Sequence, residues 1–384
     1  MQYRTNPKNN DQISALGFGC MRFNRDKKEV EKQLLHAISQ GVNYFDTAYI
    51  YGDSEAVLGR ILAENNLRSQ VKIATKLPGY LARKAEDFDK YFKTELERLQ
   101  TDYIDYYLIH MLVDLKSWQR LTGMGLLEWI AERKKQGQIR NIGFSFHGLA
   151  AEFIGILDAY DWDFCMIQYN YLDENVQAGR SGLEYAGSKR IPVMVMEPLR
   201  GGTLVHKLPP AAAQVWNQAE PCRSPADWGL RWVLNHPQVL CVLSGMGSME
   251  MVQENIRTAS DALPNTRTAE DDKLYEQVKT KIREATRVSC TGCGYCMPCP
   301  VGVDIPMCFS SLNDTVIKGK PFTRYWYIMM TDGHNASQCV QCGKCEAHCP
   351  QAIPIREKLI ESRKVLEGFP YKPMRFFLKK IIRK

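Results

Sequence analysis

The chain has 384 residues, enough for two folded domains. Its 45% apolar and 24% charged residues are typical of a globular protein. The first residues, MQYRTNPKNNDQ, lack the apolar core of a secretory signal, and apolar stretches such as Ile191 to Met196 are too short to cross a bilayer. Of the formal net charge of +7, the last 13 residues contribute +6, which leaves +1 for the rest and gives no basic face for nucleic acid.

Short β-rich runs alternate with helical patterns between Leu16 and Ser260. The candidate strands start at Leu16, Tyr44, Ile73, Tyr103, Asn141, Phe164, Val193 and Cys241. Apolar strands separated by helices indicate a parallel sheet that is covered on both faces. Eight such units in about 250 residues predict an α/β fold, the (β/α)₈ TIM barrel. A doubly wound open sheet is the alternative, but GFGCMRFNRD does not fit its glycine fingerprint.

Four polar residues fall at or just after the ends of successive predicted strands. Asp46 ends the second strand and Tyr51 follows in the loop, whereas Lys76 ends the third strand and His110 the fourth. Active sites of such barrels lie at the carboxyl ends of the strands. We expect a Lys76 ammonium, held by Asp46, to lower the pKa of Tyr51 below its usual value of about 10. Tyr51 would then protonate a substrate oxygen while a hydride reaches carbon, with His110 orienting the carbonyl.

The runs GVNYFDTAYIYGDSEAVLGR, IATKLP and LERLQTDYIDYYLIH resemble the aldo-keto reductases, barrel enzymes that reduce aldehydes and ketones with NAD(P)H. The family's Asp, Tyr, Lys, His tetrad maps onto Asp46, Tyr51, Lys76 and His110. The resemblance extends from about Leu16 to Ala259. It implies a cytoplasmic oxidoreductase that acts on a small carbonyl substrate with NADPH or NADH.

The resemblance also implies nucleotide contacts, several of which depart from the family pattern. Ser145 matches the family's serine after the fifth strand, but Phe146 stands where an asparagine is expected. Met196 replaces a tyrosine that often stacks on nicotinamide, and Met251 replaces an arginine that often binds the 2′-phosphate, so NADH and NADPH both stay open. The predicted contacts are Gly19, Cys20, Asp46, Ser145, Gln168, Met196, Leu199, Gly201, Ser244, Gly245, Glu254 and Asn255.

Nine of the 13 cysteines lie between Cys290 and Cys349. Without a secretory signal, this clustering indicates metal binding in a reducing compartment. The run that starts at Cys339 has the ferredoxin spacing C-x₂-C-x₂-C-x₃-C-P, in which the fourth cysteine binds the other cluster. The run that starts at Cys290 is one residue shorter at its last gap. The two runs together resemble a two-cluster ferredoxin.

We therefore expect two [4Fe–4S] clusters. The ligands would be Cys290, Cys293, Cys296 and Cys349 for one cluster, and Cys339, Cys342, Cys345 and Cys299 for the other. Because of the short gap, Cys308 is an alternative to Cys299, and zinc is an alternative metal. The other four cysteines, Cys20, Cys165, Cys222 and Cys241, are expected in the core, although Cys20 could also border the nicotinamide.

The predicted domains are a barrel (1–265), a polar helical connector (266–289), a dicluster ferredoxin-like domain (290–365) and a basic amphipathic tail (366–384). The tail could lie on an anionic membrane surface or dock on a partner, although a solvated end is the simpler expectation. A small core is expected from the aromatic residues between the cysteine runs: Phe309, Phe322, Tyr325, Trp326 and Tyr327.

Three functions fit these features. The first is a carbonyl reductase whose clusters are structural or redox-sensing. The second is an electron-transfer protein in which barrel and clusters form one chain, with a redox partner protein. The third is a sensor that binds nicotinamide with little turnover. Nicotinamide transfers two electrons as a hydride, whereas a cluster accepts one, and the sequence has no flavin signature to bridge the difference.

Overall fold

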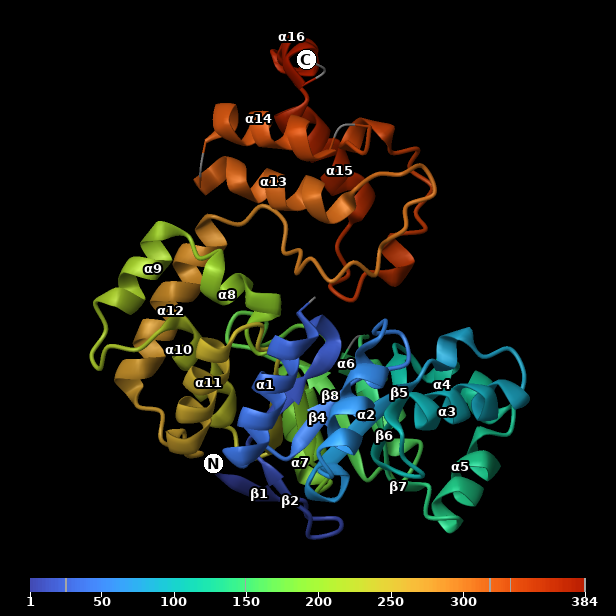
Figure 1. Ribbon diagram of the computed structural model, residues 1–384. Helices are drawn as coiled ribbons and strands as arrows, with labels where there is room; N and C mark the ends of the chain where they lie inside the picture. Colours follow the sequence, from blue (N-terminus) through green and yellow to red (C-terminus); the bar gives the residue numbers. More distant parts are fainter. Residues whose placement is uncertain (25, 149, 318, 332, 383–384) are drawn as a thin grey trace. The chain divides into compact units, whose positions relative to one another are not determined.

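The computed structural model describes residues 1–382 except 25, 149, 318 and 332 (Figure 1). Contacts divide the chain into two compact units. The barrel unit comprises Met1–Leu199 and Ser224–Thr268, and the C-terminal unit comprises Arg200–Arg223 and Ala269–Lys384. These units differ from the predicted domains, because residues 200–223 and residues 269–289 of the predicted connector belong to the C-terminal unit.

Eight parallel strands close the barrel unit in the order β10-β3-β4-β5-β6-β7-β8-β9. They are β3 (Leu16–Gly19), β4 (Tyr44–Asp46), β5 (Lys72–Leu77), β6 (Ile104–Leu112), β7 (Ile139–Phe146), β8 (Phe164–Gln168), β9 (Val193–Met196) and β10 (Val239–Ser244). Each starts within two residues of its predicted start. Because β10 pairs with β3, the ring has no edge, which confirms the predicted barrel and rules out an open sheet.

Helices follow the strands and surround the barrel (Figure 1). They are α1 (Lys27–Ser39), α2 (Ser54–Glu64), α3 (Glu86–Leu99), α4 (Leu115–Thr122), α5 (Leu126–Lys135), α6 (Ala150–Asp158), α7 (Gly179–Ser188), α10 (Pro225–Leu234) and α11 (Met249–Asp261). Local signals start several of them. The Asp26 carboxylate accepts the N–H groups of Lys28 and Glu29 at the start of α1, and Ser224 caps α10, whose first residue is Pro225.

Aromatic side chains fill the interior of the barrel. The Tyr106 ring packs edge-on against Tyr44 and Phe164, with ring centroids 5.3 and 5.0 Å apart. Met166 and Met194 complete this buried layer. A hairpin of β1 (Tyr3–Thr5) and β2 (Gln12–Ser14) precedes the barrel. Because side chains pack the interior, chemistry must take place at a rim of the barrel.

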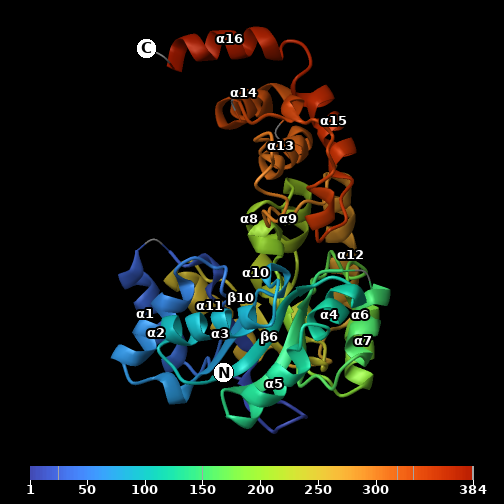
Figure 2. The ribbon, with the colours of Figure 1, turned by 90° about the vertical axis from the view of Figure 1, so that its right-hand side faces the viewer.

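The C-terminal unit is helical. Its helices are α8 (Thr203–His206), α9 (Pro210–Asn217), α12 (Ala269–Glu284), α13 (Ile305–Ile317), α14 (Lys320–Thr331), α15 (Ile355–Leu366) and α16 (Tyr371–Ile382). Helices α13, α14 and α15 pack on one another, and α12 packs on α9 (Figures 1 and 2). Short 3₁₀ turns complete the chain: η1 (Cys20–Arg22), η2 (Arg68–Gln70), η3 (Gly79–Leu81), η4 (Arg200–Gly202), η5 (Ala336–Gln338) and η6 (Glu346–His348). In the described part of the chain, no helix is both long and apolar enough to cross a membrane.

The predicted aromatic core is confirmed for two of its five members. Phe309 and Tyr327 are buried in the core of the C-terminal unit. The prediction is wrong for Phe322, Tyr325 and Trp326, which are 53%, 40% and 49% exposed. These three residues lie on the outward face of α14, because helical spacing turns them away from Tyr327.

Candidate active site and cluster site

Asp46 and Lys76 form a buried ion pair at the carboxyl end of the barrel. Asp46 is the last residue of β4, and Lys76 lies near the end of the neighbouring strand β5. Lys76 Nζ donates to Asp46 Oδ1 at 2.6 Å and to the Thr47 carbonyl at 2.7 Å. The side chains are only 1% and 7% exposed. Removing one partner would therefore leave an uncompensated buried charge.

Tyr51 and His110 lie beside this pair. Lys76 Nζ is 5.0 Å from the centroid of the Tyr51 ring. The His110 ring, on β6, packs edge-on at 6.0 Å from Tyr51 and at 6.2 Å from Tyr80. Tyr51 is presented by a tight turn in which its N–H donates to the Ala48 carbonyl at 2.9 Å. The structure thus brings all four predicted catalytic residues together.

Burial shapes the protonation states at this site. It raises the pKa of Tyr51 well above 10, and the negative charges of Asp46 and Glu197 act in the same direction. The expected lowering of this pKa by Lys76 is therefore wrong, since burial and the carboxylates outweigh the ammonium that Asp46 holds. Burial also lowers the pKa of His110 well below 6.5, helped by the charge of Lys76. Tyr51 thus keeps its proton at neutral pH, and His110 is a neutral imidazole.

Two buried polar atoms at the site have no hydrogen-bond partner among the described residues: Asp46 Oδ2 and His110 Nδ1. Such orphaned atoms are costly unless a ligand or water satisfies them. Burial raises the pKa of Asp46, although Lys76 opposes this rise. The chain therefore assembles the site by itself, and these two polar atoms can still accept or donate a hydrogen bond to a ligand or water.

Two predicted nucleotide contacts, Ser145 and Gln168, already form hydrogen bonds inside the barrel unit. Ser145 Oγ accepts the Met111 N–H at 2.9 Å, directly after His110. Gln168 Nε2 donates to Asp173 Oδ2 at 3.0 Å. Met111 has a positive φ of 56°, an uncommon conformation for a residue with a side chain. Ser145 thus supports the backbone that positions His110, a role that the sequence did not suggest.

The remaining predicted contacts lie around other strand ends, in α11 or in the C-terminal unit. Ser244 Oγ, the last residue of β10, accepts from Asn255 Nδ2 at 3.0 Å. A Cβ atom added at Gly19 would lie 3.4 Å from the Ser244 carbonyl oxygen, in ordinary van der Waals contact with the neighbouring strand. The others are placed as follows: Cys20 is buried in η1, Gly245 follows β10, Met196 and Leu199 are half-buried around the end of β9, and Glu254 is half-buried in α11. Gly201 belongs to the C-terminal unit.

Glu197 is a residue that the sequence reasoning missed. It directly follows β9, with a positive φ of 55°, and its charge acts on Tyr51. Its position directly after a strand end, in the run Met196-Glu197-Pro198, could have identified Glu197 as a site residue. Strained backbone at a strand end often marks a functional position.

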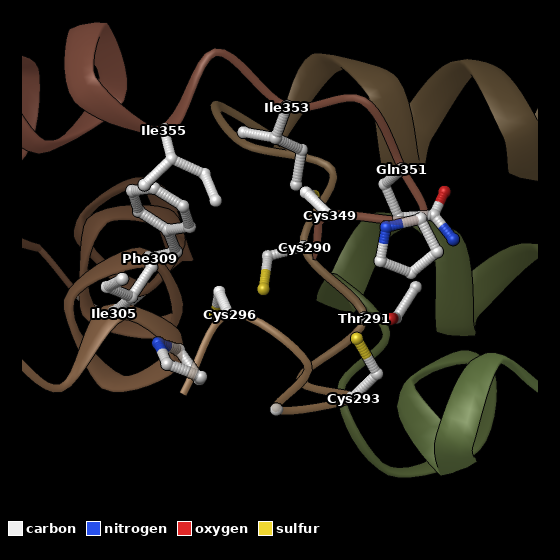
Figure 3. A pocket seen from close by; sticks show the side chains of 13 residues that line it. Cys290, Thr291, Cys293, Cys296, Ile305, Phe309, Cys349, Gln351, Ile353 and Ile355 are labelled. Atoms are coloured by element: carbon white, nitrogen blue, oxygen red, sulfur yellow. The ribbon is translucent and has the colours of Figure 1, made fainter. Parts of the chain in front are cut away.

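Four cysteines from two distant segments line one pocket of the C-terminal unit (Figure 3). They are Cys290, Cys293, Cys296 and Cys349, the predicted ligands of the first cluster. Apolar side chains, among them Ile305, close the rest of the pocket. A group of thiols in an apolar pocket fits an iron–sulfur cluster. Burial raises the pKa of Cys296 to about 12.

The second set of thiols is more open. The charges of Cys339 and Cys299 act on Cys345, so these three sulfurs lie near one another, whereas Cys342 is exposed. Cys308 is buried in α13, with its sulfur 3.7 Å from Tyr327 Oη. The charge of Cys339 acts on Cys308 as well, but burial and the contact with Tyr327 set Cys308 apart from the half-buried Cys299. Among the described residues, no three His, Cys, Asp or Glu side chains are placed to share a single metal ion.

The two cysteine loops repeat each other in backbone conformation. The N–H groups of Gly292 and Gln341 each lie 3.4 Å from the sulfur two residues earlier, Cys290 and Cys339. Positive φ angles recur at matching positions: 71° and 83° at Gly292 and Gly294, and 60° and 78° at Gln341 and Gly343. Backbone N–H groups directed at sulfur are a means of tuning a cluster.

The four cysteines that precede Cys290 were all predicted in the core. Cys20, Cys165 and Cys241 are buried, as predicted. The prediction is wrong for Cys222, which is exposed. It lies in the connection between α9 and α10.

Comparisons with known proteins agree with this geometry. Residues 15–276 match the aldo/keto reductase family, and residues 289–353 match a 4Fe-4S dicluster domain. The chain is 26% identical over 281 residues to an uncharacterized oxidoreductase of Bacillus subtilis, covering 65% of this chain and 88% of that protein. It is 28% identical over 273 residues to the NADH-specific methylglyoxal reductase of Escherichia coli, covering 58% of this chain and 80% of that enzyme.

A solved structure shows the same fold. The holo form of an aldo-keto reductase from Bacillus halodurans superposes with a TM-score of 0.61, covers 72% of this chain and 96% of that one, and is 24% identical. The family match spans more than half of the chain and includes every strand of the barrel. The chain therefore belongs to the aldo/keto reductase family of NAD(P)H-dependent oxidoreductases and continues into a ferredoxin-like 4Fe-4S dicluster domain.

Proposed function

We propose that the protein reduces a small aldehyde or ketone with NADH or NADPH, with Tyr51 as the proton donor. The observation that carries this proposal is the buried pair of Lys76 and Asp46, fixed at 2.6 Å beside the Tyr51 ring. A buried charge pair is expensive to form, and this one lies at the rim where barrel enzymes act.

The chain's own residues would handle the proton. When bound, the nicotinamide nucleotide supplies a hydride to the carbonyl carbon. Tyr51 Oη donates its proton to the carbonyl oxygen, so that the product is an alcohol and the tyrosine is left as a phenolate. Lys76, held in place by Asp46, stabilises that phenolate. Neutral His110 orients the carbonyl through a ring nitrogen.

The choice between NADH and NADPH is also part of the proposal. Met251 lies in the first turn of α11, where the family often has an arginine for the 2′-phosphate. The relative from Escherichia coli is named as NADH-specific. Both observations favour NADH as the first nucleotide to test, beside NADPH.

The test is steady-state reduction of small aldehydes and ketones, methylglyoxal among them, with each nucleotide. We expect the Tyr51→Phe variant to lose about 10²- to 10⁴-fold in kcat while still binding the nucleotide, measured by fluorescence titration. Tyr80→Phe is a matched control, because this tyrosine also packs on His110. Full activity of the Tyr51→Phe variant would contradict the proposal.

We further propose that the C-terminal domain holds two [4Fe–4S] clusters, with the ligand sets and the preference for Cys299 given above. The support is the shared pocket of Cys290, Cys293, Cys296 and Cys349 and the repeated loop conformation. Iron and sulfide analysis after anaerobic reconstitution should give about eight of each per chain. Four of each would contradict the second cluster.

The reconstituted protein also tests the alternative function, which is electron transfer or redox sensing instead of carbonyl reduction. NADH or NADPH added anaerobically without a carbonyl should leave the cluster absorbance unchanged if the clusters are structural. Bleaching that survives in the Tyr51→Phe variant would instead favour electron transfer to a partner protein. The proposed location is the cytoplasm, because the clustered cysteines between Cys290 and Cys349 have iron–sulfur spacing, and such sites fit a reducing compartment.

A further inference from the structure

The outward face of α14 carries a stripe of exposed apolar side chains. Phe322, Tyr325, Trp326, Met329 and Met330 are 53%, 40%, 49%, 36% and 56% exposed. They recur every three or four residues, the spacing of one helix face. A surface helix normally turns polar residues outward, so this stripe marks an interaction surface.

The inner face of α14 is fixed, so the helix cannot rotate to bury the stripe. Tyr327 is fully buried, and its hydroxyl donates to Glu367 Oε1 at 2.8 Å and accepts the Ala336 N–H at 2.8 Å. Thr323 and Ile328 are also buried. The stripe is therefore held outward by hydrogen bonds on the opposite face.

Helix α16 contacts α14 (Figure 2). Its residues Phe376 and Phe377 are both 64% exposed, and Phe369, just before the helix, is 91% exposed. The Arg324 guanidinium on α14 donates to the Phe369 carbonyl at 2.9 Å, which holds this residue beside α14. Exposed aromatic residues from two helices thus belong to one end of the C-terminal unit.

The charged residues of α14 and of the C-terminal segment are all basic. Residues 319–331 contain two Lys or Arg and no acid, and residues 368–384 contain six Lys or Arg and no acid. Cations interspersed with aromatic side chains fit the surface of an anionic bilayer, which attracts basic residues and takes up aromatic rings at its interface. A second copy of the chain fits less well, because a symmetric contact would bring two basic tails together.

We propose that the exposed faces of α14 and α16 form a docking surface for a membrane that contains anionic lipids. The helices would lie in the plane of the interface without crossing the bilayer. The proposal is independent of the reaction proposed for the barrel.

The first test is co-sedimentation of the full-length protein with vesicles of phosphatidylcholine, with or without phosphatidylserine. Binding is expected only with phosphatidylserine and should weaken as salt rises. Replacing Lys372, Lys379 and Lys380 by Gln should lower the partition coefficient about fivefold for each charge removed.

The second test separates apolar insertion from simple charge attraction. Tyr325→Ser with Trp326→Ser, and Phe376→Ser with Phe377→Ser, should each lower binding about tenfold or more, because exposed rings no longer enter the interface. Unchanged circular dichroism melting would show that these variants stay folded. Leu263→Ser is the control, since this leucine is 55% exposed on the barrel unit.

Equal binding of wild type and aromatic variants, equal binding to neutral vesicles, or absence of binding to either would overturn the proposal. A solution mass of two chains by light scattering that the aromatic variants reduce to one would also overturn it, because the surface would then be covered by a second copy.

Discussion

The barrel rim and the cysteine loops differ in how much of each site the chain completes by itself. At the rim, Lys76 Nζ already donates to Asp46 Oδ1 at 2.6 Å inside a closed ring of strands. In the loops, the thiols receive only N–H contacts of 3.4 Å, such as Gly292 to Cys290, and surround a pocket. The rim is thus organised before any cofactor binds, whereas the loops need their clusters to become stable.

Removal of iron should have the largest effect, and it should act on one unit only. A chelator applied to the reduced protein should unfold the cysteine loops, seen as loss of cluster absorbance and faster proteolysis between residues 290 and 350. The barrel should keep its nucleotide affinity, since none of its strands depends on the clusters. Loss of nucleotide binding together with iron would contradict the contrast between the two sites.

Single cysteine variants refine this expectation. Cys349→Ala and Cys296→Ala should each remove the same half of the iron, because both thiols line one pocket. Cys299→Ala should remove the other half. Cys308→Ala is the matched control and should keep all of the iron, since its thiol faces Tyr327 in the core. Loss of half the iron in the Cys308 variant would exchange the roles of Cys299 and Cys308.

Breaking the ion pair at the rim should destabilise the barrel strongly. Lys76→Met leaves the Asp46 carboxylate buried and unpaired, which is expected to cost about 3–5 kcal/mol of unfolding free energy. Adding Asp46→Asn should recover part of this loss, because the uncompensated charge is gone. Urea titration followed by tryptophan fluorescence measures the unfolding free energy of the single and the double variant. Equal stability of the single and double variants would mean that the pair is not coupled.

The barrel should lose stability in mild acid. Burial lowers the pKa of His147 to about 4, so between pH 6.5 and pH 4 the unfolded chain binds a proton that the folded chain does not. This contribution is complete above pH 6.5 and is lost as the pH falls toward 4, by about 1.4 kcal/mol per pH unit. Urea titrations at pH 7, 6 and 5 would show the slope, and His147→Gln should reduce it by this amount while buried His110 and His236 keep the rest. An unchanged slope in that variant would assign the effect to other groups.

The smallest expected effect lies at the first cluster. Buried Arg200 donates to the Ser289 carbonyl at 2.8 Å, next to the predicted ligand Cys290. A nearby positive charge favours the reduced, more negative cluster. Arg200→Gln should therefore move the midpoint potential of one cluster by tens of millivolts to more negative values, and Arg200→Lys should restore most of it. Redox titration followed by electron paramagnetic resonance resolves the shift, and equal shifts of both clusters would argue for a general structural change.

Local features of the chain were enough for the fold and for the types of residue at each site. Apolar runs, helical spacing and turn residues are properties of neighbouring positions, so the eight strands start close to where the sequence placed them. The Asp46, Tyr51, Lys76 and His110 motif and the two cysteine runs were readable because their chemistry depends on residue type and spacing.

Other features depended on contacts between distant residues. The raised pKa of Tyr51 comes from burial and from Glu197, which lies far along the chain. The segment 200–223 joins the C-terminal unit, and the place of Cys308 in the core is clear only once α13 and α14 pack. The outward turn of Trp326 likewise follows from which face of α14 the hydrogen bonds of Tyr327 hold inward. Burial and long-range pairing exist only after the chain has closed on itself, which is why sequence spacing alone did not reveal them.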